Sequence, residues 1–215
     1  MDKEKIKNAL DKLKADSKKR NFKQTVDLIV NLKGVDLKKD KVEYFVDLHY
    51  DMGKKVKICA LVGPELYDQA KKSLDNAVRT DEFPNYAKDK KLSKKLAKGY
   101  DLFLAQANIM AQVAASFGRT FGPLGKMPNP KAGCVVLPTA NLSQIYDKMQ
   151  KLVVIKCIKT PVVQISLGVE DQPEEKLIDN ILTVMNGLEN SLPNHMNSIG
   201  KTFIKFTMSK PIEVV

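Results

Sequence analysis

The sequence predicts a mixed α/β and α+β fold, in which a terminal α+β domain is built from both chain ends and a Rossmann-like three-layer α/β domain is inserted between them. Three observations predict this class. Apolar strands alternate with helical patterns over 53–150, which is typical of a small parallel sheet flanked by helices. The flanking segments instead carry two-residue alternation and amphipathic helices. Neither flank has enough elements to bury a core alone, so we expect 1–52 and 151–215 to form one discontinuous domain.

The first terminal segment predicts a helix followed by two strands. Ile6, Leu10 and Leu13 fall at helical spacing within the first twenty residues. From Phe22 the apolar residues alternate with polar ones up to Leu32, which predicts a strand, and a second alternating run covers 42–48. The residues between them, GVDLKKDK at 34–41, predict a loop.

The inserted segment predicts three strands and four helices in alternation. The apolar strand VKICALV breaks at Gly63-Pro64 and precedes a helix over ELYDQAKKSLDNAV. A lysine-rich helix over 88–98, the strand YDLFLA and a helix over QANIMAQVAA follow. The stretch FGRTFGPLGKMPNP, at 117–130, predicts a rigid loop because it is rich in glycine and proline. The strand CVVLP and the helix NLSQIYDKMQ complete the domain.

The second terminal segment predicts two strands, a long helix and a last strand. Residues 151–169 hold two β-rich runs, a helix begins near Pro173, and KTFIKFTM at 201–208 predicts the final strand. The chain therefore crosses between domains twice. We expect a hinge at these crossings, formed by Met52, Gly53, Gln150 and Lys151.

The composition favours a polyanionic partner. The formal net charge is +11, from 36 basic and 25 acidic residues, and nucleic acid is the leading candidate. Only Arg20, Arg79 and Arg119 are arginines, so recognition through shape and phosphates is favoured over readout of individual bases. No apolar run resembles a secretion signal or approaches the roughly 18 residues of a membrane span. We therefore expect a soluble, cytoplasmic protein without a membrane partner.

The glycine-rich stretch at 117–130 does not fit a nucleotide-binding loop. The P-loop pattern requires a glycine five positions before the Gly-Lys pair and a Ser or Thr after it, where this chain has Thr120 and Met127. Pro123, Pro128 and Pro130 also remove three backbone donors. The stretch is either a shaped turn with solvated lysines or a surface for a polyanion. The lysine run over 88–98 is most simply a solvated helix face, and an RNA-facing helix face is the less favoured alternative.

The sequence also argues against catalysis and metal binding. Cys59, Cys134 and Cys157 lie in apolar runs without a CxxC pair, so we expect buried thiols. His49 and His195 are remote from one another and from any cysteine, which disfavours a metal site. Pairing Cys134 with His195 as nucleophile and base is disfavoured, because the cysteine lies in an apolar strand. We expect no enzyme, no metal and no cofactor.

Three motifs carry a resemblance to a known family. They are RNFKQTVDL at 20–28, FGP followed by LGKMPNPKAG at 124–133, and KFTMSKP at 205–211. In this order and spacing they resemble the universal large-subunit ribosomal protein L-one family, which forms the protein part of the mobile ribosomal stalk beside the tRNA exit site. The resemblance covers nearly the whole chain and implies the two-domain fold predicted above. It also implies binding to stalk rRNA, assistance in release of exit-site tRNA, repression through the protein's own mRNA, and a monomer when free of the ribosome.

The resemblance places the main RNA surface in the terminal domain, on the first and last strands. Apolar side chains there would contact sugars and bases, hydroxyls would bond 2′-OH groups, basic residues would meet phosphates, and Asp27 would accept hydrogen bonds. Phe22 has a core alternative, and Thr207 and Met208 can be ordinary strand residues. The implied set is Arg20, Asn21, Phe22, Lys23, Thr25, Asp27, Lys205, Thr207, Met208 and Ser209.

Some positions depart from the family pattern. Ser209 replaces a glycine, Asp27 replaces the commoner glutamate, and Leu124 replaces an arginine in the glycine-rich stretch. That stretch, with Arg119, Lys126 and Lys131, is predicted as a secondary RNA-facing loop. The alternative functions are a non-ribosomal RNA chaperone and a nucleotide-dependent enzyme built on the inserted domain.

Overall fold

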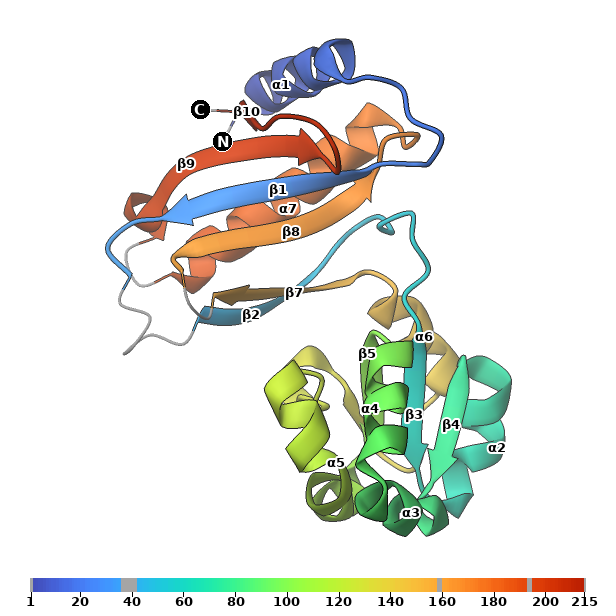
Figure 1. Ribbon diagram of the computed structural model, residues 1–215. Helices are drawn as coiled ribbons and strands as arrows, with labels where there is room; N and C mark the ends of the chain where they lie inside the picture. The colour runs from blue at the N-terminus through green and yellow to red at the C-terminus, as the bar shows by residue number, and fades with distance from the viewer. Residues whose placement is uncertain (1, 36–41, 158–159, 193–194, 215) are drawn as a thin grey trace. The chain divides into compact units, whose positions relative to one another are not determined.

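The chain forms two compact units in a computed structural model, which describes residues 2–35, 42–157, 160–192 and 195–214. The terminal unit comprises 1–54 and 151–215, and the inserted unit comprises 55–150 (Figure 1). The terminal unit is built on antiparallel strands and the inserted unit on parallel ones. The predicted combination of α+β and α/β architecture is therefore confirmed.

The terminal unit has a four-stranded antiparallel sheet in the order β10-β9-β1-β8 and a two-stranded sheet of β2 and β7. Helices α1 and α7 pack against one another, α1 also against β9, and α7 against β8 and β2. The bounds are α1 (Lys3–Asp16), β1 (Thr25–Leu32), β2 (Val42–Asp47), β7 (Leu152–Cys157), β8 (Val162–Val169), α7 (Glu174–Ser191), the 3₁₀ turn η4 (His195–Ser198), β9 (Ile199–Phe206) and β10 (Ile212–Glu213). The predicted loop over 34–41 falls mostly outside the described residues.

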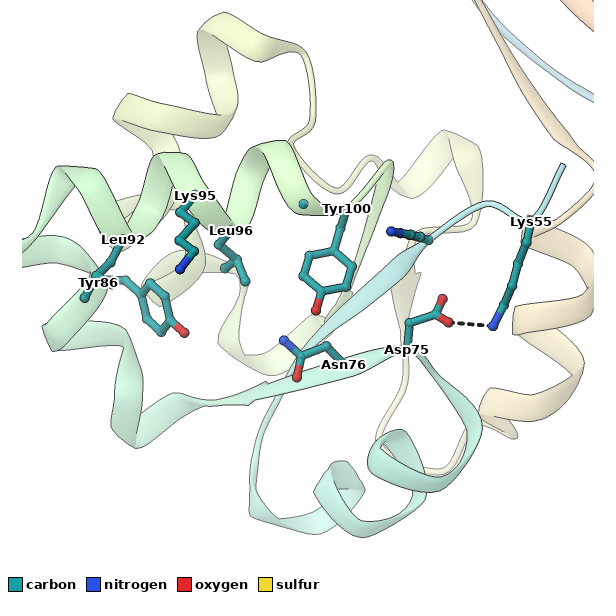
Figure 2. A pocket seen from close by; sticks show the side chains of 10 residues that line it. Lys55, Asp75, Asn76, Tyr86, Leu92, Lys95, Leu96 and Tyr100 are labelled. Carbon is teal, nitrogen blue, oxygen red and sulfur yellow. Dashed lines mark ion pairs between the residues drawn. The ribbon is translucent and has the colours of Figure 1, made fainter. Parts of the chain in front are cut away.

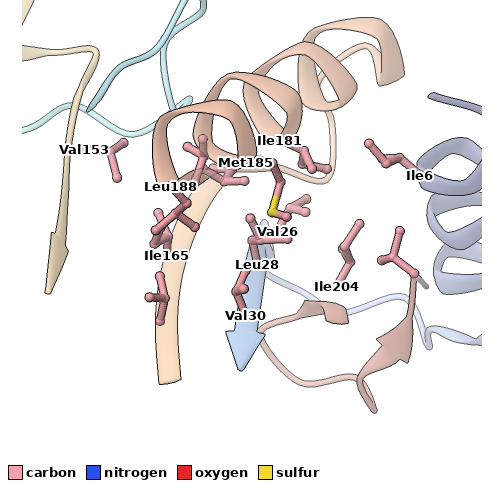
Figure 3. Close-up of a cluster of buried hydrophobic side chains, with 14 of the residues drawn as sticks. Ile6, Val26, Leu28, Val30, Val153, Ile165, Ile181, Met185, Leu188 and Ile204 are labelled. Carbon is pink, nitrogen blue, oxygen red and sulfur yellow. The ribbon is translucent and has the colours of Figure 1, made fainter. Parts of the chain in front are cut away.

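The core of the terminal unit lies between its sheet and the two helices. Alternate residues of β1 are buried, as the two-residue period predicts, and Ile6, Leu10 and Leu13 of α1 are buried at helical spacing. Figure 3 shows Val26 and Leu28 of β1 close to Met185 of α7. The intervening residues of β1, including Asp27, are only half-buried. The strand therefore has one packed face and one face with access to solvent.

The inserted unit has a parallel sheet in the order β4-β3-β5-β6. Every residue of β3 is buried, so both faces of the sheet are covered. Helices α2 and α6 contact each other, and α3, α4 and α5 form a second group. The bounds are β3 (Ile58–Val62), α2 (Pro64–Ser73), β4 (Asn76–Arg79), η1 (Thr80–Glu82), α3 (Phe83–Lys88), α4 (Lys90–Gly99), β5 (Leu102–Gln106), η2 (Ala107–Ile109), α5 (Met110–Leu124), η3 (Pro130–Ala132), β6 (Val135–Val136) and α6 (Leu142–Met149).

The predicted loop at 117–130 is wrong in its first half, because α5 continues to Leu124. Phe117 and Phe121 lie one turn apart on this helix, and both are fully buried. Their rings are 4.9 Å apart, and Phe121 also packs against Phe103 at 4.2 Å. Burial of these rings outweighs the poor helix propensity of Gly118, Gly122 and Pro123. Gly125 then ends the helix with a positive φ of 63°.

Two further expectations about the inserted unit are corrected. The predicted helix over 65–78 ends at Ser73, and Asn76–Arg79 form β4 at the edge of the sheet, with Val78 buried. The short helix α3 was not predicted, although its Phe83 is buried against Phe117.

In the terminal unit, α1 ends at Asp16, before the predicted twentieth residue. Among the described helices, none has the length and apolarity needed to cross a membrane.

Candidate nucleic-acid interface

The predicted terminal site is assembled by the pairing of β1 with β9. The strands are antiparallel, with Val26 opposite Phe206 and Asp27 opposite Lys205. The start of β1 therefore lies beside the end of β9, although the two segments are 182 residues apart in sequence. This register brings the first and last sequence motifs into one place. Thr207 and Met208 follow β9 in a turn and are not part of the strand.

Two threonines join the motifs directly. The Thr25 N–H donates to Thr207 Oγ1 at 3.0 Å, and the two hydroxyl oxygens are 2.8 Å apart. The Thr207 N–H donates to the Thr25 carbonyl at 3.1 Å. Thr25 is buried, whereas Thr207 is exposed. Thr25 therefore holds the turn in position, and Thr207 presents its surface to solvent.

Gln24 fixes the backbone of the same turn, and sequence reasoning missed it. Its side-chain oxygen accepts the Met208 N–H at 3.2 Å, and its amide nitrogen donates to Glu170 at 3.2 Å. The Gln24 carbonyl also accepts the Glu170 N–H at 3.0 Å. Gln24 is only 2% exposed. Both side-chain partners of Gln24 are distant in sequence, so the first motif alone carries no signal that would have found it.

Two large apolar side chains of the site face solvent. Phe22 is 51% exposed and Met208 is 61% exposed. The alternative that Phe22 belongs to the core is therefore wrong, since the residue lies in the bend before β1. An exposed ring and a flexible thioether next to hydroxyl groups suit contact with sugars and base faces.

Basic residues surround these apolar side chains. Arg20, Asn21 and Lys23 are exposed in the segment leading into β1. The Lys23 ammonium is 2.9 Å from Asp171, and hydrogen bonding to that carboxylate raises the pKa of Lys23. Both side chains are largely exposed, so exchanging Asp171 for a phosphate costs little.

A hollow of about 470 Å³ adjoins the site between the end of α1 and the turn after β9. Met208, Ser209 and Arg20 line it, together with Lys18 and Lys210, which the sequence prediction omitted. Asp16 is the acidic residue among its lining groups. The hollow therefore extends the positive surface around Met208.

Ser209 uses its side chain to close the turn that carries Thr207 and Met208. Its Oγ accepts the Phe206 N–H at 2.8 Å and lies within donor range of the carbonyls of Lys210, at 3.1 Å, and Phe206, at 3.4 Å. The hydroxyl is thus engaged with its own turn. The serine that replaces the family glycine therefore stabilises the local backbone conformation.

The three residues of the predicted secondary loop lie in different environments. Arg119 is exposed on α5, and Lys131 is exposed in η3. The Lys126 ammonium donates to the carbonyls of Ala97 at 2.8 Å and Tyr100 at 2.6 Å, where α4 ends. Lys126 therefore stabilises a helix C-terminus within the inserted unit.

The four predicted hinge residues lie where the chain passes between the units. Gln150 bonds both the N–H and the carbonyl of Val56, at 2.9 and 2.8 Å, within the inserted unit. Lys151 donates to the His49 carbonyl at 3.1 Å, and Met52 packs on the terminal core. Gly53 has a φ of 69°, and a Cβ there would lie 2.6 Å from Val169. Their role as a hinge remains a prediction.

The expected burial of the thiols is confirmed, since all three cysteines are buried. Burial, with a smaller contribution from the charge of Glu82, raises the pKa of Cys59 to about 12, and burial also raises the pKa values of Cys134 and Cys157. These thiols are neutral at pH 7 and unsuited to nucleophilic chemistry. The Nδ1 atom of His49 is 2.6 Å from the Oδ2 atom of Asp179. Within the described ranges, no three His, Cys, Asp or Glu side chains gather in a possible metal site.

An exposed aromatic ring, a thioether and basic side chains in neighbouring segments are features that suit a nucleic-acid-binding class of protein. Comparison with known proteins then gives the family: the model of the ribosomal protein L1p/L10e family matches residues 13–210. The chain belongs to this family, so the resemblance carried by the three motifs is confirmed. The family consists of structural ribosomal proteins, which confirms that the chain is not an enzyme and contradicts the enzymatic alternative.

The curated relatives match along nearly their whole length. Large ribosomal subunit protein uL1 of Thermococcus kodakarensis is 37% identical over 99% of this chain and 98% of its own length. The uL1 protein of Nanoarchaeum equitans is 36% identical over 93% of this chain and 95% of its own. That of Methanothermococcus thermolithotrophicus is 32% identical over 100% and 99%, respectively.

Proposed function

We propose that this protein is a structural constituent of the large ribosomal subunit, which binds stalk rRNA through the terminal surface around Phe22 and Thr207. The observation that carries this proposal is the Thr25–Thr207 pair. It unites two motifs from opposite ends of the chain into one surface with exposed Phe22 and Met208. The uL1 names of the relatives support the same assignment.

Each part of this surface has a role in the proposed RNA contact. Phe22 stacks on a base or sugar, Met208 packs beside it, and the free lone pair or proton of the Thr207 hydroxyl bonds a 2′-OH. Arg20, Lys23 and the neighbouring basic residues neutralise phosphates. Asp27, half-buried opposite Lys205, accepts a hydrogen bond from a 2′-OH or a base.

The proposal extends to the functions implied by stalk binding. The protein assists release of exit-site tRNA in the cytoplasm, represses translation by binding a similar fold in its own mRNA, and is a monomer when free of the ribosome. If the mRNA and the rRNA share the terminal surface, one substitution there must weaken both complexes by similar factors. Repression of a reporter that carries the protein's own leader sequence measures this directly.

The main test compares RNA binding by two variants that each lose one exposed apolar side chain. Phe22→Ala removes the proposed stacking ring, and Leu137→Ala removes a side chain that is 64% exposed in the inserted unit. The ring is expected to contribute about 1–3 kcal/mol, or roughly 5- to 150-fold in affinity for a stalk rRNA fragment. Leu137→Ala is expected to bind like the wild type.

Titration with salt provides the second readout. Binding through several phosphates makes the logarithm of the association constant fall linearly with the logarithm of salt concentration, with a slope of several units. Phe22→Ala keeps all the charges, so its slope must equal that of the wild type. Equal affinities of Phe22→Ala, Leu137→Ala and the wild type would place the RNA site elsewhere.

A further inference from the structure

A second basic and aromatic site lies in the inserted unit and shares no residue with the terminal surface. It is a cavity of about 580 Å³, a size suited to one nucleotide or a small ligand. Figure 2 shows the side chains that line it, which come from the segment before β3, the start of β4, and the helices α3 and α4. The lining comprises Lys55, Lys57, Asp75, Asn76, Tyr86, Leu92, Lys95, Leu96, Gly99 and Tyr100.

The position of this cavity differs from the usual ligand site of a parallel α/β sheet. Lys57 directly precedes β3, Asn76 begins β4, and Tyr100 lies just before β5. The cavity is therefore at the amino ends of these strands, whereas ligands of α/β sheets usually bind at the carboxyl ends. The usual nucleotide site of a parallel α/β sheet therefore does not account for this cavity.

The charges lining the cavity favour an anion. Three lysines and one aspartate give a net charge of +2. Asp75 is already engaged, because it pairs with Lys55 at 2.7 Å and accepts the Ile58 N–H at 3.0 Å. Among the described residues, no carboxylate forms a close ion pair with the ammonium group of Lys57 or Lys95, although the charge of Lys57 helps Lys55 to lower the pKa of Asp75. Both groups are exposed and available to phosphates.

Two tyrosines supply flat surfaces beside these charges. The Tyr86 ring packs 5.5 Å from Phe117, and the Tyr100 ring meets Phe103 edge-on at 6.3 Å. Contact with the core fixes each ring, and both rings also line the cavity. A fixed ring loses little conformational entropy when a base stacks on it. The Asn76 side chain adds a donor and an acceptor that suit a base edge.

The surroundings favour a polymer over a free nucleotide. Helix α4 carries lysines along the exposed surface that continues from the cavity, at Lys90, Lys91, Lys94, Lys95 and Lys98. A ten-residue helix is about 15 Å long, which is longer than one nucleotide. Leu92 is 46% exposed among these lysines, at the cavity wall. Lys126 caps the carbonyls at the end of α4 and offsets the negative end of the helix dipole there.

We propose that this cavity is a second RNA site, which takes one unstacked nucleotide of a single strand between Tyr86 and Tyr100 while Lys57 and Lys95 hold its phosphates. It goes beyond the terminal rRNA site and does not depend on it. The exposed lysine face of 88–98 then contacts the RNA phosphates next to this nucleotide. Base stacking gives this site little sequence specificity, because every base has a flat face.

The test uses the full-length chain and a single-stranded hexauridylate, with Lys57→Gln/Lys95→Gln as the cavity variant. Lys71→Gln/Lys72→Gln is the matched control, because it removes the same charge from exposed positions on α2. We expect the cavity variant to bind at least fivefold more weakly than the control. Its salt slope should fall by about 1.4 units, since each single-strand phosphate contact contributes about 0.7.

Crosslinking supplies a readout of the aromatic contact. A hexamer containing 5-iodouridine should crosslink to Tyr86 or Tyr100, and competition with uridine monophosphate should be weak. Equal binding by the two lysine variants, or crosslinks only at the terminal surface, would overturn the second site. Full displacement by uridine monophosphate or by an acidic peptide at similar concentration would contradict an RNA strand as its ligand.

The two RNA sites can fail separately. If Phe22→Ala binds stalk rRNA normally, the proposed terminal RNA surface is wrong regardless of hexamer binding. If Phe22→Ala loses stalk rRNA but binds hexauridylate as the wild type does, the terminal and inserted sites are independent, as we expect. If Phe22→Ala abolishes hexamer binding as well, the cavity is not a separate site.

Discussion

Replacement of Thr207 by valine tests how the terminal site is held together. Valine has nearly the same shape as threonine but has no hydroxyl, so the substitution removes the acceptor of the Thr25 N–H at 3.0 Å and the partner of the Thr25 hydroxyl at 2.8 Å. Thr25 is only 7% exposed, so water can replace these bonds only in part. A buried donor without a partner costs about 1–3 kcal/mol.

Water reaches the exposed Thr207 side of this pair, so we expect the lower part of that range, about 1–2 kcal/mol. The direct assay is hydrogen exchange at the Thr25 amide, which loses its protection when the bond is absent. In parallel, denaturant unfolding followed by circular dichroism measures the loss of stability. RNA affinity should fall as well, because the turn no longer holds Thr207 and Met208 in a fixed position against the start of β1.

Thr207→Ser is the matched control, because serine keeps the hydroxyl and removes only a methyl group. Its Thr25 amide should remain protected, and its RNA affinity should stay within about threefold of the wild type. Unchanged protection of the Thr25 amide in Thr207→Val would refute the structural role of the pair. Normal protection in both variants with weak RNA binding only by valine would leave the hydroxyl as a direct RNA contact.

Three further predictions concern residues with defined local contacts. Lys126→Met should destabilise the inserted unit by about 1–3 kcal/mol in denaturant unfolding, since two carbonyls at the end of α4 lose their donor. Its affinity for stalk rRNA should not change. A loss of affinity without destabilisation would contradict this role of Lys126. Ser209→Gly should lower unfolding stability by about 0.5–1.5 kcal/mol through loss of the bond to the Phe206 N–H, and RNA affinity should fall with it because this turn carries Thr207 and Met208; stability equal to wild type would show that the turn does not need the hydroxyl. The pKa of Cys59 is about 12 in the folded protein, against an ordinary value near 9. The thiolate therefore forms first in the unfolded chain, and the free energy of unfolding falls as the pH rises above about 9. Between pH 8 and 10, under reducing conditions, the wild type should lose about 1.4 kcal/mol more unfolding free energy than Cys59→Ala, and parallel pH profiles would exclude this effect.

Periodicity predicted the elements whose burial follows a simple pattern. The alternation in β1 and the helical spacing of Ile6, Leu10 and Leu13 correspond to one packed face each. Periodicity failed where tertiary contacts override local preference. Gly118, Gly122 and Pro123 indicate a loop, yet the buried rings of Phe117 and Phe121 keep that segment helical. The four residues of β4 gain their strand conformation by pairing with β3, which the sequence around Asn76 does not reveal.

The candidate site shows the same limit. The motifs supplied Phe22, Thr25 and Thr207, but their proximity depends on the register of β1 against β9, which no spacing in the sequence encodes. Gln24 was missed because its function comes from two hydrogen bonds to distant segments. Lys126 looked like a phosphate ligand because a lysine in a polar stretch carries no sign of a carbonyl partner 29 residues away.

The most direct test of the terminal RNA site is the oxidation of Met208 by hydroxyl radicals in the free protein and in its complex with stalk rRNA. Met208 is 61% exposed, so it should oxidise readily in the free protein. We predict that the RNA slows this oxidation several-fold while Leu137, in the inserted unit, reacts at an unchanged rate. Equal oxidation of Met208 with and without saturating stalk rRNA would contradict an interface at this surface.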